Sequence, residues 1–188
     1  MKGIFCMLCL AFLISVSASG QTNKKEVGLR VAYAFKEEDL PERKDYRPIL
    51  ILPYYNYYLT KKEKALRLSA FLEGQLSPVL VEYENATHRD LEWELGFNIG
   101  PSLSYRIKEV VPYIAVAYGA NYITINTAKQ ADELIFTATT FAGIKKHIDN
   151  RWYGDAHFRL RHISNGGMKQ PNLGIDNAFI GIGLSKFY

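Results

Sequence analysis

Apolar and polar residues alternate with a period of two through most of this chain. Such alternation is typical of β-strands that have one apolar face. The clearest alternating segments are residues 27–35, 66–76, 91–99, 114–122 and 178–184, and weaker ones cover 49–60, 136–148 and 152–164. A content of 13 tyrosines and 10 phenylalanines also favours strands. The sequence therefore predicts an all-β fold with eight strands.

The polar faces of these segments contain charged side chains, namely Arg30, Arg67, Glu73, Glu92, Glu94, Asp155, Arg159 and Arg161. Burying one unpaired ion costs several kcal/mol, so a small β-sandwich would not place this many inside. Two arrangements remain. Either the charged faces meet bulk water around an apolar core, or the apolar faces meet lipid around a polar, ion-paired interior. The second arrangement is the pattern of a transmembrane β-barrel.

The connections between the predicted strands alternate in length. Long connections are expected at about 37–48, 77–89, 124–134 and 165–174, and short ones at 61–64, 108–109 and 149–150. Outer-membrane barrels have short periplasmic turns and longer external loops, whereas a soluble lipocalin-like barrel has no reason to alternate them. The sequence therefore predicts an eight-stranded antiparallel transmembrane β-barrel in the outer membrane of a bacterial cell.

Aromatic residues support the membrane interpretation. The interfacial aromatic girdles are expected to contain Trp93, Tyr105, Tyr113 and Trp152. The sequence ends on Phe187-Tyr188, which resembles the terminal strand of bacterial outer-membrane barrels. We therefore expect insertion by the barrel-assembly machinery and contact with outer-membrane lipids, and the sequence leaves a homodimer open.

The N-terminal residues are typical of a secretory signal peptide. Lys2 precedes an apolar run over residues 4–16, and small residues follow at 17–20. We expect a signal peptide at 1–20 and one barrel domain at 21–188. Both cysteines, Cys6 and Cys9, lie in the segment expected to be removed, which excludes disulfides and thiolate chemistry in the mature chain. A net charge of +4 is too balanced to indicate nucleic acid, and no residue cluster predicts a metal or another cofactor.

Candidate catalytic residues stand on the faces expected to meet lipid. In segment 152–164 the apolar face ends with His162 and Ser164, whose Cα atoms would be about 6.6 Å apart along a strand. Side chains that lean toward each other can close this gap to a hydrogen bond, so the imidazole could accept the serine proton. Asp176 begins the apolar face of the last segment, and it would lie beside His162 if the two strands pair. A Ser-His-acid triad would result. Polar groups that face hydrocarbon are costly and usually functional.

A glycine-rich connection follows the candidate serine. Asn165, Gly166 and Gly167 permit a turn with positive φ that brings backbone N–H groups together, and these donors or the Asn172 amide could stabilise an oxyanion. Alone, a His-x-Ser pair is a weak signal and Asn-Gly-Gly is an ordinary turn sequence. The hypothesis depends on finding these features together.

The stretch His162-Ile163-Ser164-Asn165-Gly166-Gly167-Met168-Lys169-Gln170-Pro171-Asn172-Leu173-Gly174-Ile175-Asp176 resembles the signature of the bacterial lipid A 3-O-deacylases. These are eight-stranded outer-membrane esterases that act on lipopolysaccharide. The resemblance implies that Ser164 is the nucleophile, His162 the base and position 176 the acid, with Asn165, Gly166, Gly167 and Asn172 around the oxyanion. The family pattern usually has glutamate where this chain has Asp176, and the shorter carboxylate must sit closer to His162.

The resemblance further implies a substrate and a product. Ser164 would attack the 3-position acyl ester of lipid A in the outer leaflet, and a 3-hydroxy fatty acid would leave. Lys169 could contact a lipid A phosphate. Two other classes stay open on the residues alone. One is a structural or adhesion-type barrel without catalysis, and the other binds a small molecule in its interior through Arg159 and Arg161.

Overall fold

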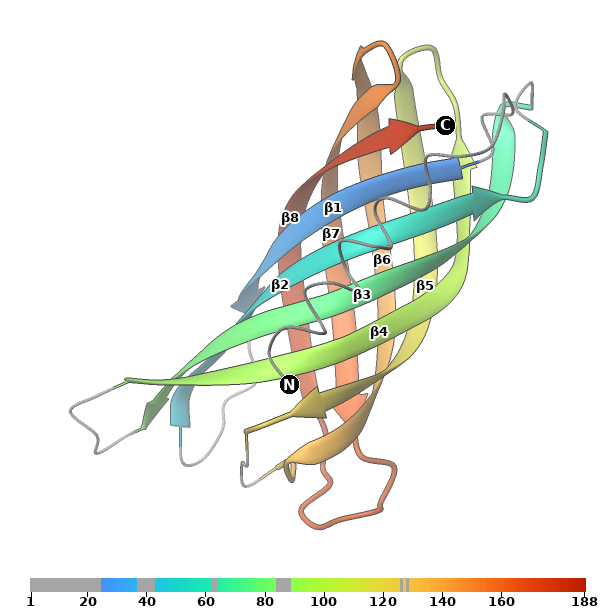
Figure 1. Ribbon diagram of the computed structural model, residues 1–188. Helices are drawn as coiled ribbons and strands as arrows, with labels where there is room; N and C mark the ends of the chain where they lie inside the picture. Colours follow the sequence, from blue (N-terminus) through green and yellow to red (C-terminus); the bar gives the residue numbers. More distant parts are fainter. Residues whose placement is uncertain (1–24, 37–42, 62–63, 84–88, 126, 128) are drawn as a thin grey trace, which may run out of the picture.

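The protein is a closed antiparallel β-barrel in which each strand pairs with the next and β1 pairs with β8 (Figure 1). The computed structural model describes residues 25–36, 43–61, 64–83, 89–125, 127 and 129–188. The strands are β1 (Lys25–Lys36), β2 (Arg43–Tyr58), β3 (Leu66–Tyr83), β4 (Arg89–Tyr105), β5 (Val110–Ile123), β6 (Glu133–Asp149), β7 (Trp152–Ser164) and β8 (Ile175–Phe187). The expected all-β, eight-stranded barrel is confirmed, while the expected signal peptide at 1–20 lies outside the described residues.

Two of the expected long connections are shorter than the sequence suggested. β3 continues to Tyr83, although a connection was expected from about residue 77, and β2 already begins at Arg43. In β3 the alternation persists, because Val79 is buried and Leu80 is 45% exposed. Backbone pairing with β4 therefore continues outward to the register of Glu82 with Arg89.

No helix in the described part of the chain is long and apolar enough to cross a membrane.

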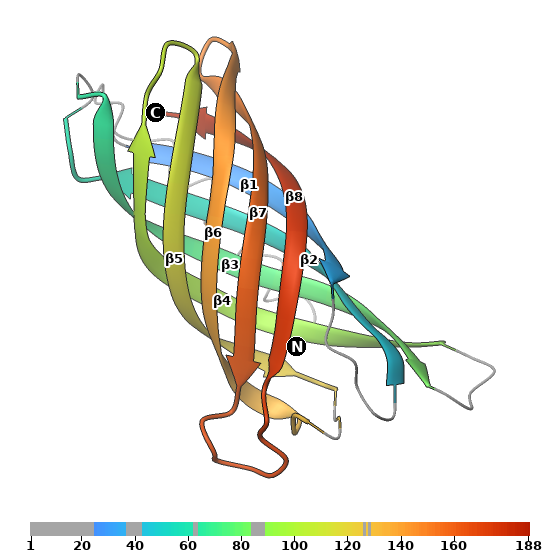
Figure 2. The same cartoon turned by 180° about the vertical axis from the view of Figure 1, so that it is seen from behind.

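The two ends of the barrel differ in their connections. β1, β3, β5 and β7 finish at the end drawn at the bottom of Figures 1 and 2, whereas β2, β4 and β6 finish at the top, where the C-terminus lies. The two longest connections, residues 124–132 after β5 and 165–174 after β7, are at the bottom, and the two shortest, 106–109 after β4 and 150–151 after β6, are at the top. Outer-membrane barrels place their longer loops outside the cell and their short turns in the periplasm. We therefore name the two ends external and periplasmic.

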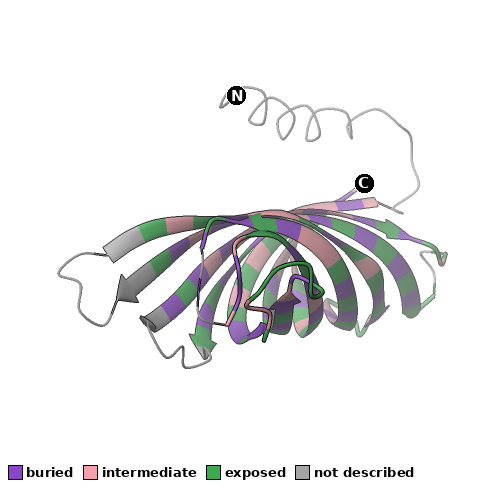
Figure 3. Cartoon of the chain, turned by 90° about the horizontal axis from the view of Figure 1, so that it is seen from below, coloured by how far each residue is buried: buried purple, intermediate pink, exposed green. Residues whose placement is uncertain are grey.

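Buried and exposed residues alternate along the strands, so the wall has two distinct faces (Figure 3). Leu29 and Val31 are 48% and 40% exposed on the outside, while Arg30 between them is 3% exposed. Inside, the Arg159 guanidinium donates to both Glu73 oxygens at 2.7 and 2.9 Å. An apolar outside around an ion-paired inside is the arrangement of a membrane barrel, and the protein is an outer-membrane barrel.

Of the residues predicted from these patterns, Glu92 keeps its face but lies at a different depth, and Tyr113 lies on the other face. Glu92 is on a polar face but at the external rim, where it is partly exposed and accepts a hydrogen bond from Thr124. Tyr113 was expected in an aromatic girdle and is instead buried, donating to Asp155 Oδ2 at 2.7 Å. The girdle prediction was wrong because the outward set of β5 begins at Ile114, which turns Tyr113 inward. The other three predicted girdle residues are exposed on the outer face, namely Trp93, Tyr105 and Trp152.

An apolar cluster fills the interior at the external end. It contains Tyr46, Val79, Ile123, Ile125, Ile135, Ile163 and Ile175. Ile163 of β7 and Ile175 of β8 are in direct register, and both are at most 1% exposed. Close packing of these inward side chains fixes the backbone of β7 and β8 at the external end.

Candidate functional site

Two side chains on the outer wall form a hydrogen-bonded pair at the external end of β7 and β8. His162 and Asp176 are register partners, and Nδ1 of His162 lies 2.8 Å from Oδ1 of Asp176. Their side chains are 49% and 75% exposed, so both stand on the face that meets lipid. The strand pairing expected from the sequence is thus present, and the shorter carboxylate of aspartate reaches the ring directly. Because Asp176 occupies Nδ1, the other ring nitrogen of His162, Nε2, is available for another partner.

Ser164 follows His162 on the same face, further toward the external end of β7. It is partly exposed and lies opposite Phe136 of β6. Among the hydrogen bonds of the described residues, none joins Ser164 to His162. The Cα atoms of the two residues are about 6.6 Å apart along the strand. Rotation of the side chains can bring Oγ of Ser164 to hydrogen-bonding distance of the imidazole.

Gly174 packs against the edge of the His162 ring and was not singled out by the sequence. A Cβ built at Gly174 would lie 2.6 Å from Cε1 and 3.0 Å from Nε2 of His162. Gly174 immediately precedes β8 at the external end, so Nε2 faces that end, which is the direction in which Ser164 lies. Its φ of +79° also favours glycine. We infer that Gly174 positions the imidazole.

Replacing Gly174 with alanine should displace the His162 ring from Asp176. Loss of alignment by about 1 Å commonly lowers turnover about 10²-fold, so we expect a decrease in kcat of that size. The measurement is the rate of fatty-acid release by the folded barrel. Gly167→Ala is the comparison, because Gly167 has a similar φ of +84° but a Cβ there would meet nothing within 4 Å. An equal decrease in both variants would attribute the effect to distortion of the loop backbone and not to the contact of Gly174 with the imidazole.

The connection between β7 and β8 is held by the side chain of Asn165, which is 1% exposed. Its Nδ2 donates to the carbonyl of Lys169 at 2.7 Å, and its Oδ1 accepts from the backbone N–H of Gly167 at 3.0 Å. The backbone N–H of Asn165 donates to Oδ1 of Asn172 at 2.8 Å. Within the described residues, no hydrogen bond is formed by the backbone N–H of Gly166 or by Nδ2 of Asn172. These two donors are therefore available to a ligand.

The β5–β6 connection braces this loop through contacts that the sequence did not indicate. Gln130 forms a backbone bridge with Asn172, and the N–H of Leu173 donates to the carbonyl of Lys129 at 2.7 Å. A Thr three residues before Gln130 predicts a local turn, but no sequence signal pairs that turn with residues more than forty positions later. These contacts tie the β7–β8 connection to the β5–β6 connection.

Lys169 lies in an acidic environment. Its Nζ contacts Oδ1 of Asp132 at 2.5 Å and Oε1 of Glu133 at 3.5 Å. The hydrogen bond that Lys169 donates to Asp132, together with the nearby charge of Glu133, raises the pKa of Lys169. A lipid A phosphate at Lys169, as the sequence suggested, would have to share the ammonium with these two carboxylates.

Inside the barrel, the two arginines considered for a small-molecule site are each paired with a glutamate. Arg161 donates to Oε2 of Glu94 at 2.6 Å and Arg159 pairs with Glu73, while Nδ1 of His157 lies 2.7 Å from Asp155. These charges are neutralised within the wall, which disfavours the interior small-molecule site. Among the described residues, no three or more His, Cys, Asp and Glu side chains form a group that could hold a metal ion.

A membrane barrel with a hydrogen-bonded His-Asp pair and a serine on its lipid-facing wall defines a class, the outer-membrane β-barrel enzymes. A family model described as lipid A 3-O-deacylase (PagL) matches residues 54–185, and the chain belongs to this family. It is accordingly an outer-membrane lipid A deacylase, a hydrolase whose substrate is lipid A. Family membership also disfavours the non-catalytic structural or adhesion-type barrel.

Comparison with solved structures supports the fold. The crystal structure of the outer-membrane enzyme PagL is similar with a TM-score of 0.59 and 18% identity, over 84% of this chain and 97% of that one. Neisserial surface protein A is similar with a TM-score of 0.52 and 12% identity, over 90% of this chain and 100% of that one. No curated protein matches the sequence.

Proposed function

We propose that this chain hydrolyses the 3-position acyl ester of lipid A with Ser164 as nucleophile, His162 as general base and Asp176 as the acid. The observation that supports this proposal is the 2.8 Å contact between His162 Nδ1 and Asp176 Oδ1 on the lipid-facing wall beside Ser164. A carboxylate at Nδ1 selects the tautomer whose Nε2 can accept a proton, and it stabilises the imidazolium that forms.

The reaction proceeds in two steps. Ser164 Oγ attacks the ester carbonyl while its proton passes to His162 Nε2, and the sugar oxygen leaves with that proton. Water then attacks the acyl-serine, again with His162 as base. The products are a free 3-hydroxy fatty acid and a lipid A that lacks one acyl chain.

The tetrahedral intermediate needs hydrogen-bond donors for its oxyanion. We assign this role to the backbone N–H of Gly166 and to Nδ2 of Asn172, two donors that are open in the loop. Asn165 and Gly167 act indirectly, because their mutual hydrogen bond and the contact of Asn165 with Asn172 set the loop conformation. Removing one such donor typically lowers the rate about 10²–10³-fold.

The location of the site suits a lipid substrate. It lies at the external end of the barrel, on the outside of the wall, at the level of the outer leaflet in which lipid A resides. The ester can therefore reach Ser164 without the lipid leaving the membrane. We further propose that residues 1–20 are removed as a signal peptide and that the barrel-assembly machinery inserts residues 21–188. N-terminal sequencing of the membrane-inserted protein tests the cleavage site.

Asp176→Asn should lower turnover about 10²–10⁴-fold, because the amide no longer stabilises the imidazolium and can hold the wrong tautomer. Asp176→Glu should keep at least a tenth of the activity, since it restores a carboxylate of the length usual in the family. Mass spectrometry of lipid A from cells expressing each variant measures the fraction deacylated.

Asp149→Asn is the matched control for this experiment. Asp149 is exposed at the periplasmic turn, at the opposite end of the barrel, and its substitution should leave deacylation unchanged. Wild-type turnover in Asp176→Asn would remove Asp176 from the proposed triad.

A further inference from the structure

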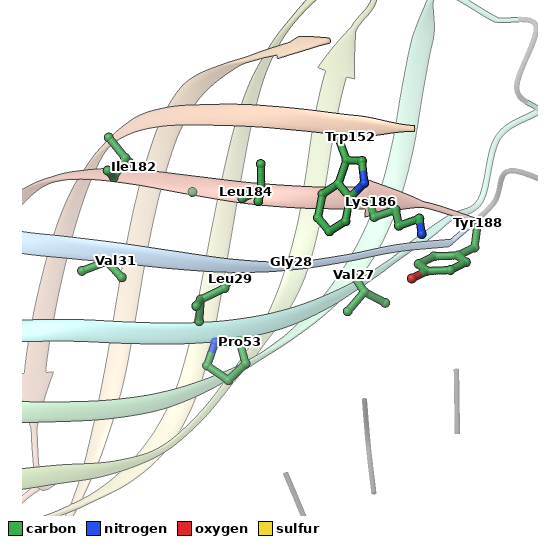
Figure 4. A pocket seen from close by; sticks show the side chains of 11 residues that line it. Val27, Gly28, Leu29, Val31, Pro53, Trp152, Ile182, Leu184, Lys186 and Tyr188 are labelled. Atoms are coloured by element: carbon green, nitrogen blue, oxygen red, sulfur yellow. The ribbon is translucent and has the colours of Figure 1, made fainter. Parts of the chain in front are cut away.

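A groove follows the outside of β1 and β8 in the periplasmic half of the wall. Its volume is about 580 Å³, within the ~300–1,000 Å³ of typical small-ligand sites. Outward side chains of Leu29, Val31, Ile182 and Leu184 line most of it (Figure 4). Since this surface faces hydrocarbon in the membrane, the groove must be filled by apolar material.

The groove has the length of one membrane leaflet. From Ile182 to Tyr188 the strand extends about 20 Å at about 3.4 Å per residue. With a strand tilt of about 40° this is roughly 15 Å along the membrane normal, which is half of a hydrocarbon core about 30 Å thick. The groove therefore runs from about the membrane centre to the periplasmic surface.

A cation stands at the periplasmic end of the groove. Nζ of Lys186 lies 5.4 Å from the ring centre of Trp152 and 5.3 Å from that of Tyr188 (Figure 4). Among the described residues, Nζ of Lys186 contacts these two aromatic faces and forms no ion pair with a carboxylate. Trp and Tyr side chains are enriched at the level of lipid headgroups, so the ammonium lies where a lipid phosphate would be.

We propose that this groove binds one glycerophospholipid of the periplasmic leaflet. An acyl chain lies along Leu29 and Leu184, and the phosphate accepts a hydrogen bond from Nζ of Lys186. The match between an apolar groove one leaflet long and a cation at its headgroup end favours a phospholipid over a second copy of the chain, because one phospholipid supplies both an acyl chain of that length and an anion at its end.

This site is separate from the catalytic one. Asp176 and Lys186 lie at opposite ends of β8, about 34 Å apart along the strand at about 3.4 Å per residue. The bound phospholipid therefore contacts neither Ser164 nor His162. It serves as an annular lipid that anchors the paired strands β1 and β8 in the periplasmic leaflet of the membrane.

Native mass spectrometry of the full barrel tests the proposal. The protein is purified in mild detergent and titrated with phosphatidylglycerol, with phosphatidylethanolamine and with phosphate-free diacylglycerol. We expect one phospholipid per barrel and at least fivefold weaker retention of diacylglycerol. Lys186→Gln should reduce phospholipid retention about fivefold, and Leu184→Trp, which fills the groove from an outward position, should reduce it more than tenfold.

Controls separate this site from general lipid contact. Lys108→Gln removes an exposed cation from the β4–β5 turn at the same end of the barrel and should retain phospholipid as wild type does. All variants should show wild-type heat-modifiable migration and wild-type deacylation, because none alters the external site. Equal retention of diacylglycerol, an equal effect of Lys108→Gln, or a lipid-free dimer closed over the groove would each overturn the proposal.

Discussion

Ser164→Ala is expected to lower lipid A deacylation about 10³–10⁶-fold, the range found when a triad nucleophile is removed. Without the hydroxyl no acyl-enzyme can form, and the remaining oxyanion donors and bound substrate support only residual hydrolysis by water. The measurement is the release of 3-hydroxy fatty acid from purified lipid A, together with the mass of the lipid A left in the membrane.

Thr140→Ala provides a matched control for the serine variant. Thr140 is an exposed residue of β6 on the same outer wall, paired in register with Leu160 of β7. Its substitution removes an outward hydroxyl near the site without touching the proposed triad, so activity should remain at the wild-type level. Folded Ser164→Ala protein that still deacylates lipid A at the wild-type rate would refute the nucleophile assignment.

His162→Gln is expected to have an effect of similar size, a loss of at least 10³-fold. Glutamine can hydrogen-bond with Asp176 but cannot accept the serine proton, so Ser164 stays an unactivated alcohol. Residues that act as a unit are strongly non-additive. The double variant of His162 and Ser164 should therefore be no slower than the slower single variant, as measured in the same fatty-acid release assay.

His147→Gln tests whether any histidine near the wall has this effect. His147 lies at the periplasmic end, where Nε2 contacts the carbonyl of Asn150 at 2.9 Å. Activity should be unchanged in this variant. If the rate decrease in the double variant of His162 and Ser164 equalled the product of the two single-variant decreases, the two residues would act independently, contrary to a shared proton transfer.

The faces of the strands were predictable because a β-strand turns successive side chains to opposite sides. The outward positions of His162 and Asp176 followed from the period of two. Their contact followed from antiparallel pairing across one connection, which is a local relation within a single hairpin. The same reasoning failed for Tyr113, where residue type suggested a girdle but the alternation within β5 had already assigned it to the interior.

Depth along the barrel was not predictable. Glu92 shares a face with Glu94, yet Glu94 is fully buried and paired with Arg161 while Glu92 reaches the rim. Periodicity gives the side of the wall on which a residue lies, but its height relative to other strands depends on the stagger of the closed barrel. The extension of β3 beyond Ser77 was missed for the same reason, since pairing with β4 decides where a strand ends.

The sequence by itself determined the barrel, the two faces of its wall and the residues of the proposed triad, because these depend on period-two alternation and on neighbours in one hairpin. Only the tertiary structure decided that Gly174 packs against the imidazole, that Gln130 braces Asn172, and that Lys186 ends a groove between β1 and β8. The first two contacts depend on the conformations of the β5–β6 and β7–β8 connections, which strand periodicity does not specify, and the groove exists because β1 pairs with β8 when the sheet closes on itself.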